Sequence, residues 1–400
     1  MFYSIYIGMS GLEGFSKGLK VISNNVANLN TPGFKASNLQ FTDAYYQQGT
    51  LSGSQSGNPA PQYGTGLNTL TSTINFLTGE LRQTGNSMDV NVSGDGFLVV
   101  QDKEGGEAHY TRDGQLQFDK DGNLVSRTSG KYVMGFDADA QSLSRITLNG
   151  LRSNPAKATG TVKFTGNLSS GTDESTISNV KLIDALGGEH VVSLKFKKKG
   201  DSEPNAWTVT ISEGTTTVGS GDIGFTDGKP NASANSVTFT YTPTGGAPAF
   251  SVKLDFSGDV TSFASGNLTS LAMSSQDGYA AGTISKAEFD ANGKLSLTYT
   301  NGQTAKGAQL ALARFESLQS LSEVGGGEFS TADAQAATLG RPGSTGFGTI
   351  GSNQLELSNV DLSGEFSNLI VMQRGYQASS RIVSTANDML QELFDMKGRG

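Results

Sequence analysis

The stretch SNVDLSGEFSNLIVMQRGYQASSRIVSTANDMLQELFDM, residues 358–396, decides the fold of this chain. Steps of four and three residues along it give a mostly apolar heptad seam. The seam consists of Leu362, Phe366, Leu369, Gln373, Tyr376, Ser380, Val383, Asn387, Leu390 and Phe394. A second register opens in the latter half, with Ile382, Ala386, Met389, Leu393 and Met396. The pattern predicts a helix of roughly 35 residues, about 50 Å long, that contacts more than one neighbour.

The first thirty residues carry a matching three-four repeat. It runs through Ile5, Gly8, Leu12, Phe15, Leu19, Ile22, Val26 and Leu29. We therefore expect an N-terminal helix that pairs with the C-terminal one as a coiled coil, while the rest of the chain is looped out between them. The N-terminal helix can occupy only one seam of its partner. The second register is then left for other copies of the chain, and the apolar side chains of both helices form the predicted assembly interface.

Four glycines interrupt the N-terminal repeat at positions that form a stripe of small residues: Gly8, Gly11, Gly14 and Gly18. Each glycine inside a helix costs roughly 1 kcal/mol relative to alanine. A helix of about 25 residues with four of them should be largely unfolded in water on its own. We interpret the stripe as close-packing glycines and expect both termini to be mobile in the monomer and to fold on assembly.

Composition excludes several classes of protein. The 400 residues include no cysteine and two histidines, so disulfides, zinc–thiolate sites and histidine-rich metal sites are excluded. A net charge of −8 without a long basic run argues against nucleic acid as a partner. No apolar run approaches the ~20 residues of a membrane span. The beginning of the chain has none of the features of a cleaved signal peptide, so we expect export by another route if the protein leaves the cell.

The middle of the chain predicts β structure in two parts. The motif Phe-Asp-x-x-Gly-x-Leu occurs at 118–124 and again at 289–295, each time as a hairpin signal, and links two distant stretches. We expect a multidomain α+β protein with two mainly antiparallel β domains. The predicted parts are helix 1–30, an extended connector 31–79, a discontinuous β domain 80–150 plus 276–357, an inserted β domain 151–275, and helix 358–400, which begins at Ser358 as a capping residue.

Both ends also carry a sequence motif. The N-terminal motif contains Asn24, Asn25, Ala27, Asn28, Asn30, Thr31, Gly33, Phe34 and Lys35. The C-terminal motif contains Ser358, Asn359, Val360, Asp361, Gln373, Arg374, Tyr376 and Gln377. Together, in this order and at these ends, they resemble the signatures of the bacterial flagellar rod and hook axial proteins. The segment with Gly187, His190, Phe196, Lys198, Trp207 and Val209 is similar to the middle domain of hook members.

The resemblance implies a structural subunit of the flagellar hook, located at the bacterial flagellum on the cell surface. It implies export through the flagellar type III system and self-assembly into a curved helical tube that transmits torque as a universal joint. The implied partners are other copies of the chain, the distal rod protein, the hook cap protein, the hook–filament junction protein and the export apparatus. It implies neither a cofactor nor insertion into a membrane.

Two alternatives remain open. The distal rod protein has similar ends, but rod members are shorter and lack a large insert such as 151–275. A secreted β-rich adhesin or carbohydrate-binding module would predict a soluble monomer with dispensable termini.

We predict no catalytic, cofactor or metal site. The loop from Gly343 to Thr349 lacks the lysine of a phosphate-binding loop, and the run from Asp119 to Asn123 is interpreted as a hairpin turn rather than a calcium loop.

Overall fold

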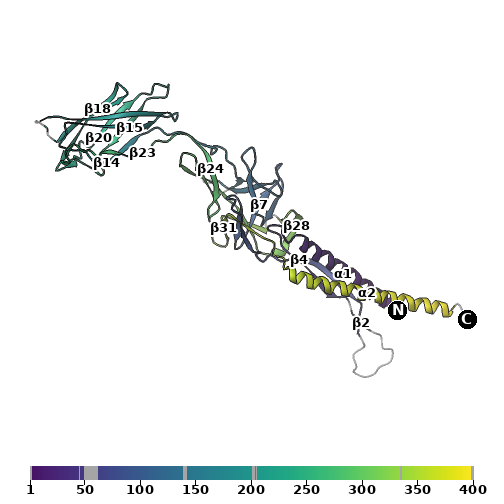
Figure 1. Ribbon diagram of the computed structural model, residues 1–400. Helices are drawn as coiled ribbons and strands as arrows, with labels where there is room; N and C mark the ends of the chain where they lie inside the picture. The colour runs from purple at the N-terminus through teal and green to yellow at the C-terminus, as the bar shows by residue number, and fades with distance from the viewer. Residues whose placement is uncertain are drawn as a thin grey trace. The chain divides into compact units, whose positions relative to one another are not determined.

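Figure 1 shows the computed structural model of the chain. The structure describes residues 2–44, 46–48, 62–137, 142–200, 203, 205–333 and 336–397. Helix α1 spans Phe2–Ala27 and helix α2 spans Leu362–Lys397. The regular elements described between them are strands and a short 3-10 turn, η1 (Leu318–Ser320). The predicted architecture of a helix at each end and a β-rich middle is therefore confirmed.

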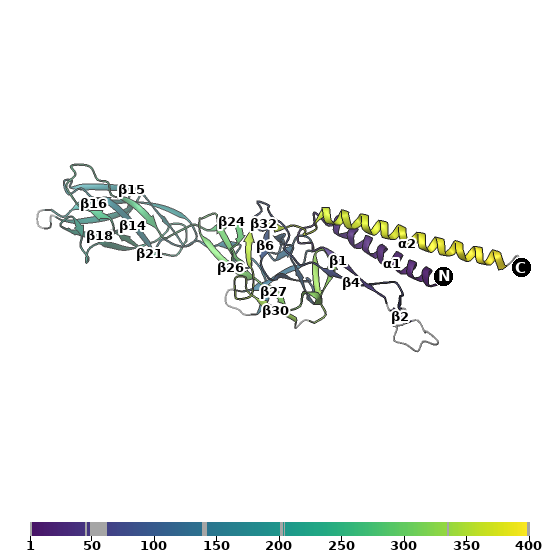
Figure 2. The same cartoon turned by 90° about the horizontal axis from the view of Figure 1, so that it is seen from below.

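The two terminal helices lie side by side in both views (Figures 1 and 2). Helix α1 ends at Ala27, so Leu29 of the predicted repeat lies in the turn that follows. Helix α2 was expected to begin directly after Ser358 as its capping residue, but it begins three residues later, at Leu362. Its capping residue is Asp361, whose Oδ1 accepts a hydrogen bond from the Ser363 N–H at 3.1 Å. The hydroxyl of Ser358 instead accepts from the Val360 N–H.

Residues 31–79 are more than the extended connector that their composition predicts. Strand β1 (Ser37–Asp43) pairs antiparallel with β4 (Leu67–Ile74), and β2 (Tyr46–Gln48) pairs with β3 (Gln62–Gly64). The β1–β4 hairpin packs on α1, where the Phe15 and Phe41 rings lie 6.1 Å apart. Leu39 and Phe41 alternate with polar residues in β1, but β4 shows no such alternation, and the polar composition of the region predicts no strands. The predicted connector at 49–61 lies outside the described residues.

The chain divides into two compact units, and the first contains both helices. Unit 1 comprises Met1–Leu148, Ala287–Ser296 and Lys306–Gly400. Its main sheet runs in the order β11-β7-β8-β29-β28, with β27 beside β7. Phe97, Tyr110, Phe315 and Phe329 belong to the core that this sheet buries. The strands of this unit are β5 (Leu81–Gln83), β6 (Val90–Ser93), β7 (Phe97–Gln101), β8 (Ala108–Thr111), β9 (Leu116–Phe118), β10 (Leu124–Ser126), β11 (Tyr132–Phe136), β12 (Leu143–Arg145), β27 (Leu312–Phe315), β28 (Leu321–Gly325), β29 (Glu328–Thr331), β30 (Ala337–Gly340), β31 (Thr349–Ser352) and β32 (Gln354–Glu356).

Unit 2 comprises Asn149–Lys286 and Leu297–Ala305, so it extends further toward the C-terminus than the predicted insert of 151–275. Strands β24 (Gly282–Phe289), β25 (Lys294–Tyr299) and β26 (Thr304–Leu310) each pass from one unit into the other. The hairpin signals at 118–124 and 289–295 predicted both turns: Asp119 and Asp290 each accept a backbone N–H four residues on, at 2.8 and 2.9 Å.

Two five-stranded sheets of unit 2 share one apolar core. One has the order β15-β16-β17-β18-β19, and the other has the order β20-β21-β14-β22 with β23 beside β14. Trp207 is fully buried between them, as expected for two sheets packed face to face. The strands of these two sheets are β14 (Thr161–Asn167), β15 (Glu174–Ile183), β16 (Glu189–Lys198), β17 (Ala206–Glu213), β18 (Thr216–Thr226), β19 (Lys229–Pro230), β20 (Ser236–Tyr241), β21 (Phe250–Asp255), β22 (Val260–Thr261) and β23 (Ala272–Gln276). Strand β13 (Ser153–Asn154) pairs with β24 instead.

Candidate functional site where the two ends of the chain meet

The glycine stripe of α1 lies against α2. A Cβ atom on Gly8 would stand 2.7 Å from Val383 Cγ2, and one on Gly11 would stand 2.6 Å from Ser379 Oγ. At Gly18 the nearest atom would be Met372 Sδ, at 3.0 Å. These three glycines bring the two helix backbones closer than side chains would permit, which offsets their unfavourable helix propensity.

The fourth glycine of the stripe has a different neighbour. A Cβ on Gly14 would lie 2.6 Å from Leu67 Cδ2, on strand β4. The amide of Leu67 donates to Ser10 Oγ, and Lys17 Nζ donates to Thr69 Oγ1 on the same strand. Helix α1 is therefore packed on two sides, by α2 and by the β1–β4 hairpin.

The surface of α2 that meets α1 consists of smaller side chains than the predicted seam. Ser379 and Ala386 are buried, and a Cβ on Gly375 would collide with the Phe15 ring at 2.5 Å. Leu369, Val383 and Leu390 of the seam are half-buried, whereas Phe366 and Phe394 remain exposed. The predicted division into one seam for α1 and a second register for other copies therefore differs from the structure. Bulky seam residues would hold the helices apart, so serine, glycine and alanine occupy the contact.

A large apolar surface on the helices stays uncovered within the chain. On α1 it comprises Tyr3, Tyr6, Ile7 and Met9; on α2 it comprises Leu362, Phe366, Ile370, Val371, Tyr376, Ile382, Met389, Leu393, Phe394 and Met396. We call this surface the open helical face. The remaining predicted interface residues of α1 are Ile5, Leu12, Phe15, Leu19 and Val26, all half-buried, and Ile22, which is buried. Leu29, in the turn after α1, is half-buried as well.

The two sequence motifs meet at the other end of the helix pair, around Asn25. This buried side chain donates to Glu365 Oε1 on α2 at 2.7 Å and to the Ser37 carbonyl on β1 at 2.8 Å. Its own Oδ1 accepts from the Ser37 N–H at 3.0 Å. One asparagine thus joins α1, α2 and the connector hairpin, because an amide side chain both donates and accepts.

A second joint is ionic and almost fully buried. Lys35 Nζ contacts Glu356 Oε1 and also donates to the Leu77 carbonyl at 2.9 Å. Arg112 Nη1, from the loop after β8, lies 3.5 Å from Glu356 Oε2. Burial lowers the pKa of the Lys35 ammonium, against the opposing effect of Glu356, and burial likewise lowers the pKa of Arg112. We call these three side chains the ion clasp.

Gly33 and Asn359 complete the joint through backbone bonds. The Gly33 N–H donates to the Glu356 carbonyl at 2.8 Å, and a Cβ at this left-handed position (φ +71°) would strike the Asp113 backbone N–H nitrogen at 2.5 Å. Asn359 accepts from the Ala36 N–H and donates to the Asn75 and Leu77 carbonyls. Phe34, Ala36 and Val360 form a small buried cluster beside it.

The other motif residues fall into two groups. Asn24, Asn28 and Thr31 shape the end of α1, since Asn28 Nδ2 donates to the Asn24 carbonyl and Thr31 Oγ1 donates to Asn28 Oδ1. Ala27 and Asn30 are exposed. Gln373, Arg374, Tyr376 and Gln377 are exposed on α2, away from the joint. The C-terminal motif therefore contains an internal joint and an outward-facing segment.

Sequence reasoning missed Glu356, Glu365 and Arg112 as partners of the motifs. Each lies in a stretch whose pattern predicts a strand, a turn or a helix and gives no sign of a buried ionic partner. The available signal is Lys35, which belongs to the N-terminal motif and follows the Thr-Pro-Gly turn closely. If such a lysine is buried, it needs a carboxylate as its counter-ion. Nothing in the spacing indicates which carboxylate supplies it.

The contacts of this joint hold chain segments together. Among the described residues there is no group of three or more histidine, cysteine, aspartate or glutamate side chains able to hold a metal ion. Asp119 uses its carboxylate on the turn that ends at Asn123, as the hairpin interpretation predicted. Neither of the described helices is long and apolar enough to cross a membrane.

Comparison with protein families supports the resemblance seen in the motifs. Residues 5–35 match the model described as flagella basal body rod protein, and residues 352–396 match that of the flagellar basal body rod FlgEFG protein C-terminal region. Residues 91–168 match the flagellar hook protein FlgE/F/G D1 domain. The first two regions coincide with the segments that carry the buried joint and the helix contact.

Similar full-length proteins have one description. The flagellar hook protein FlgE of Borreliella burgdorferi is 29% identical across 99% of this chain and 100% of its own length. That of Escherichia coli K12 is 29% identical across 97% of this chain and 98% of its own length. A crystal structure of Helicobacter pylori flagellar hook protein FlgE2 has 14% identity and a TM-score of 0.48, over 67% of this chain and 98% of that one, a score too low to compare the folds. From the family models and the full-length relatives, this chain belongs to the family of bacterial flagellar hook and rod proteins.

Proposed function

We propose that this chain is a structural subunit of the flagellar hook, which polymerises into a curved helical tube and serves as a flexible universal joint between the basal-body rod and the filament. The family is structural and is not an enzyme family. The observation that supports polymerisation best is the open helical face. Large exposed apolar side chains that recur along both helices mark a surface suited to burial among other helices.

The open helical face offers a substantial driving force for association. Burying one large apolar side chain is worth roughly 1.5–3 kcal/mol, and α2 alone exposes Phe366, Ile370 and Val371 within two turns. Exposed apolar side chains extend to the end of α2, at Phe394 and Met396. Contacts between unlike surfaces that never close produce an open helical filament, so neighbouring copies that cover this face would build a tube.

The hook is preferred to the distal rod because of the size of the middle of the chain. Unit 2 adds a complete sandwich to the part that carries the joint and the helices. The hook relatives align over at least 97% of this chain, including that part. The distal rod protein remains the second candidate, since the family models at both ends are those of rod proteins as well.

We extend the proposal to assembly in the cell. The subunit leaves through the flagellar type III export apparatus and joins the distal rod protein, the hook cap protein and the hook–filament junction protein. The termini become ordered on assembly, because the open helical face is covered only then. Limited proteolysis tests this step: cleavage of the free monomer within α1 and α2 should precede cleavage within unit 2. Equal resistance of the three parts would contradict it.

Electron microscopy of the purified protein tests the function. At raised salt and concentration we expect curved tubes. Straight tubes would support the distal rod protein instead. A protein that stays monomeric under all such conditions, and that keeps its fold when both helices are removed, would support the adhesin or carbohydrate-binding alternative.

A further inference from the structure

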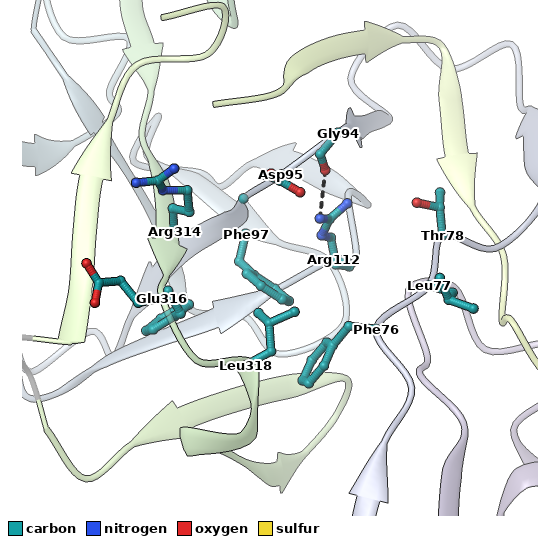
Figure 3. Close-up of a pocket in the computed structure, with 12 residues that line it drawn as sticks. Phe76, Leu77, Thr78, Gly94, Asp95, Phe97, Arg112, Arg314, Glu316 and Leu318 are labelled. Carbon is teal, nitrogen blue, oxygen red and sulfur yellow. Dashed lines mark hydrogen bonds between the residues drawn. The ribbon is translucent and has the colours of Figure 1, made fainter. Parts of the chain in front are cut away.

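A cavity of about 580 Å³ lies inside unit 1, next to the ion clasp (Figure 3). One wall is the segment 75–80, which we call the strap, represented by Leu77 and Thr78. The opposite wall consists of Arg314, Glu316 and Leu318, as Figure 3 shows. Phe97 forms the floor between them.

The strap is attached to the segments that border the helices. Its Leu77 carbonyl accepts from Lys35 and Asn359, at 2.9 and 2.8 Å, and its Gly79 N–H donates to Glu356 Oε1 at 3.0 Å. The β sheet holds the other half of the clasp, because Arg112 donates from Nη1 to the Val92 carbonyl and from Nη2 to the Gly94 carbonyl. The strap, bonded to Lys35 and Glu356, therefore faces Arg112, which is bonded to the β sheet, across the Arg112–Glu356 pair.

That pair is incomplete. Glu356 Oε2 and Arg112 Nε are buried and have no hydrogen-bond partner among the described residues. Arg112 Nη1 carries two hydrogens and uses one on Val92, so the second is available to Glu356. The 3.5 Å between Nη1 and Oε2 exceeds a normal charged hydrogen bond by about 0.6 Å. Buried polar atoms without partners are rare, and each one calls for an explanation.

The strap also has an uncovered outer side. Leu77 is 71% exposed, although it borders a cavity whose lining includes the apolar side chains of Phe97 and Leu318 beside charged ones. Its neighbour Phe76 is already docked, with its ring 5.6 Å from Phe97 and 5.4 Å from Phe329. The strap is thus held at Phe76 by ring contacts and at Leu77 and Gly79 by hydrogen bonds, and the cavity lies beside it.

We propose that the strap and Glu356 move together toward Arg112 when copies of the chain assemble, closing the pair to a direct hydrogen bond and reducing the cavity. This inference rests on the proposed polymerisation. The trigger is a neighbouring copy that covers Leu77 and presses the strap inward. The closed clasp then links the helices to the β sheet more tightly than in the free subunit, so the joint stiffens only where copies are in contact.

A double-mutant cycle on Arg112→Lys and Glu356→Gln tests the proposal. We expect each single change to raise the critical concentration for tube formation about tenfold, and the double variant to raise it no further, because the lost bond is the same. In monomer unfolding the same cycle should show weaker coupling, since the pair is 3.5 Å apart there and the direct hydrogen bond is not yet formed. Arg314→Lys, on the opposite wall, is the matched control and should stay within about twofold of the wild type.

Should the variants fail to fold, cryo-electron microscopy of wild-type tubes replaces the cycle. We expect Arg112 Nη1 within about 3.1 Å of Glu356 Oε2 in the assembled subunits. Tubes in which the pair stays at 3.5 Å or more, or additive effects on the critical concentration, would overturn the strap proposal while leaving polymerisation intact. A wild-type chain that forms no tubes under any condition would overturn both.

Discussion

Gly8 of α1 lies so close to Val383 of α2 that a Cβ atom on the glycine would stand 2.7 Å from Val383 Cγ2 and 3.3 Å from the Ser379 carbonyl oxygen. Neither neighbour can yield easily. Valine in a helix has one strongly preferred rotamer, and the carbonyl is part of the helix backbone. The contact between two ends of one chain, 375 positions apart, therefore depends on the absence of a single methyl group.

Replacing Gly8 by alanine should destabilise the helix pair, although alanine is the better helix former by roughly 1 kcal/mol. We expect a net loss of about 1–3 kcal/mol from overpacking, measured as urea unfolding followed by α-helix circular dichroism. Gly11→Ala is the matched comparison and should cost less, because the Ser379 hydroxyl that it meets can rotate away. Adding Val383→Ala should restore the Gly8→Ala variant; failure of that rescue would contradict the assigned contact.

The buried Lys35–Glu356 pair should behave as one unit. Lys35→Met leaves a buried carboxylate with only Arg112 beside it, and Glu356→Gln leaves a buried ammonium without its counter-ion. Each single change should therefore cost about 3–5 kcal/mol of unfolding free energy. The double variant should cost clearly less than the sum, because no uncompensated charge remains from the pair.

The control for this cycle is the exposed pair Lys17–Glu13, 2.8 Å apart on one face of α1. The same substitutions there should leave the unfolding free energy almost unchanged, because the pair is exposed to solvent. Equal costs at the two sites would show that burial of the ion clasp does not persist in solution.

Unit 2 should lose stability in acid through Asp184. The hydrogen bond to His190, 3.0 Å long, holds the pKa of this carboxyl below its ordinary value, helped by the Gly188 and Leu186 N–H groups. A carboxyl with a lowered folded-state pKa binds fewer protons folded than unfolded. Its contribution is therefore complete above the unfolded pKa of about 3.9 and disappears as the pH falls through the lowered pKa.

Asp184→Asn measures that contribution. The variant should be less stable than the wild type at pH 7, and the difference should shrink as the pH falls below about 4. Thermal unfolding of both proteins between pH 7 and pH 3 gives the comparison. A difference in stability that is constant over this range would mean that the carboxylate charge is not what stabilises the turn.

How far the sequence leads can be judged from particular residues. Periodicity predicted both helices, because apolar residues repeat at helical spacing over many turns. Paired Phe-Asp-x-x-Gly-x-Leu signals predicted the turns at Asp119 and Asp290, since the turn chemistry is local. The β domain expected in the insert contains strands, among them β14, β16, β17, β20 and β21.

The sequence did not reveal which residue contacts which, where many residues could serve as the partner. Ser379 and Gly375 carry no hydrophobic signal, yet they meet α1, because the spacing between two backbones favours small side chains over apolar ones. Glu356 is one of 37 acidic residues, and only the three-dimensional structure places it against Lys35. The β1–β4 hairpin was missed because its strands are short of apolar residues and gain their stability from α1.

The open helical face gives the most direct test of assembly. Phe366 and Phe394 are 51% and 70% exposed, so replacing either by aspartate should leave the monomer fold almost unchanged. In a tube the same carboxylate would have to be buried among apolar helices, where an unpaired charge is strongly disfavoured. We therefore expect both variants to form no tubes at concentrations at which the wild type does, with sedimentation and electron microscopy as readouts. Leu268→Asp, at an equally exposed leucine of unit 2, is the control and should still polymerise. Tubes from Phe394→Asp at the wild-type concentration would show that the end of α2 is not buried on assembly.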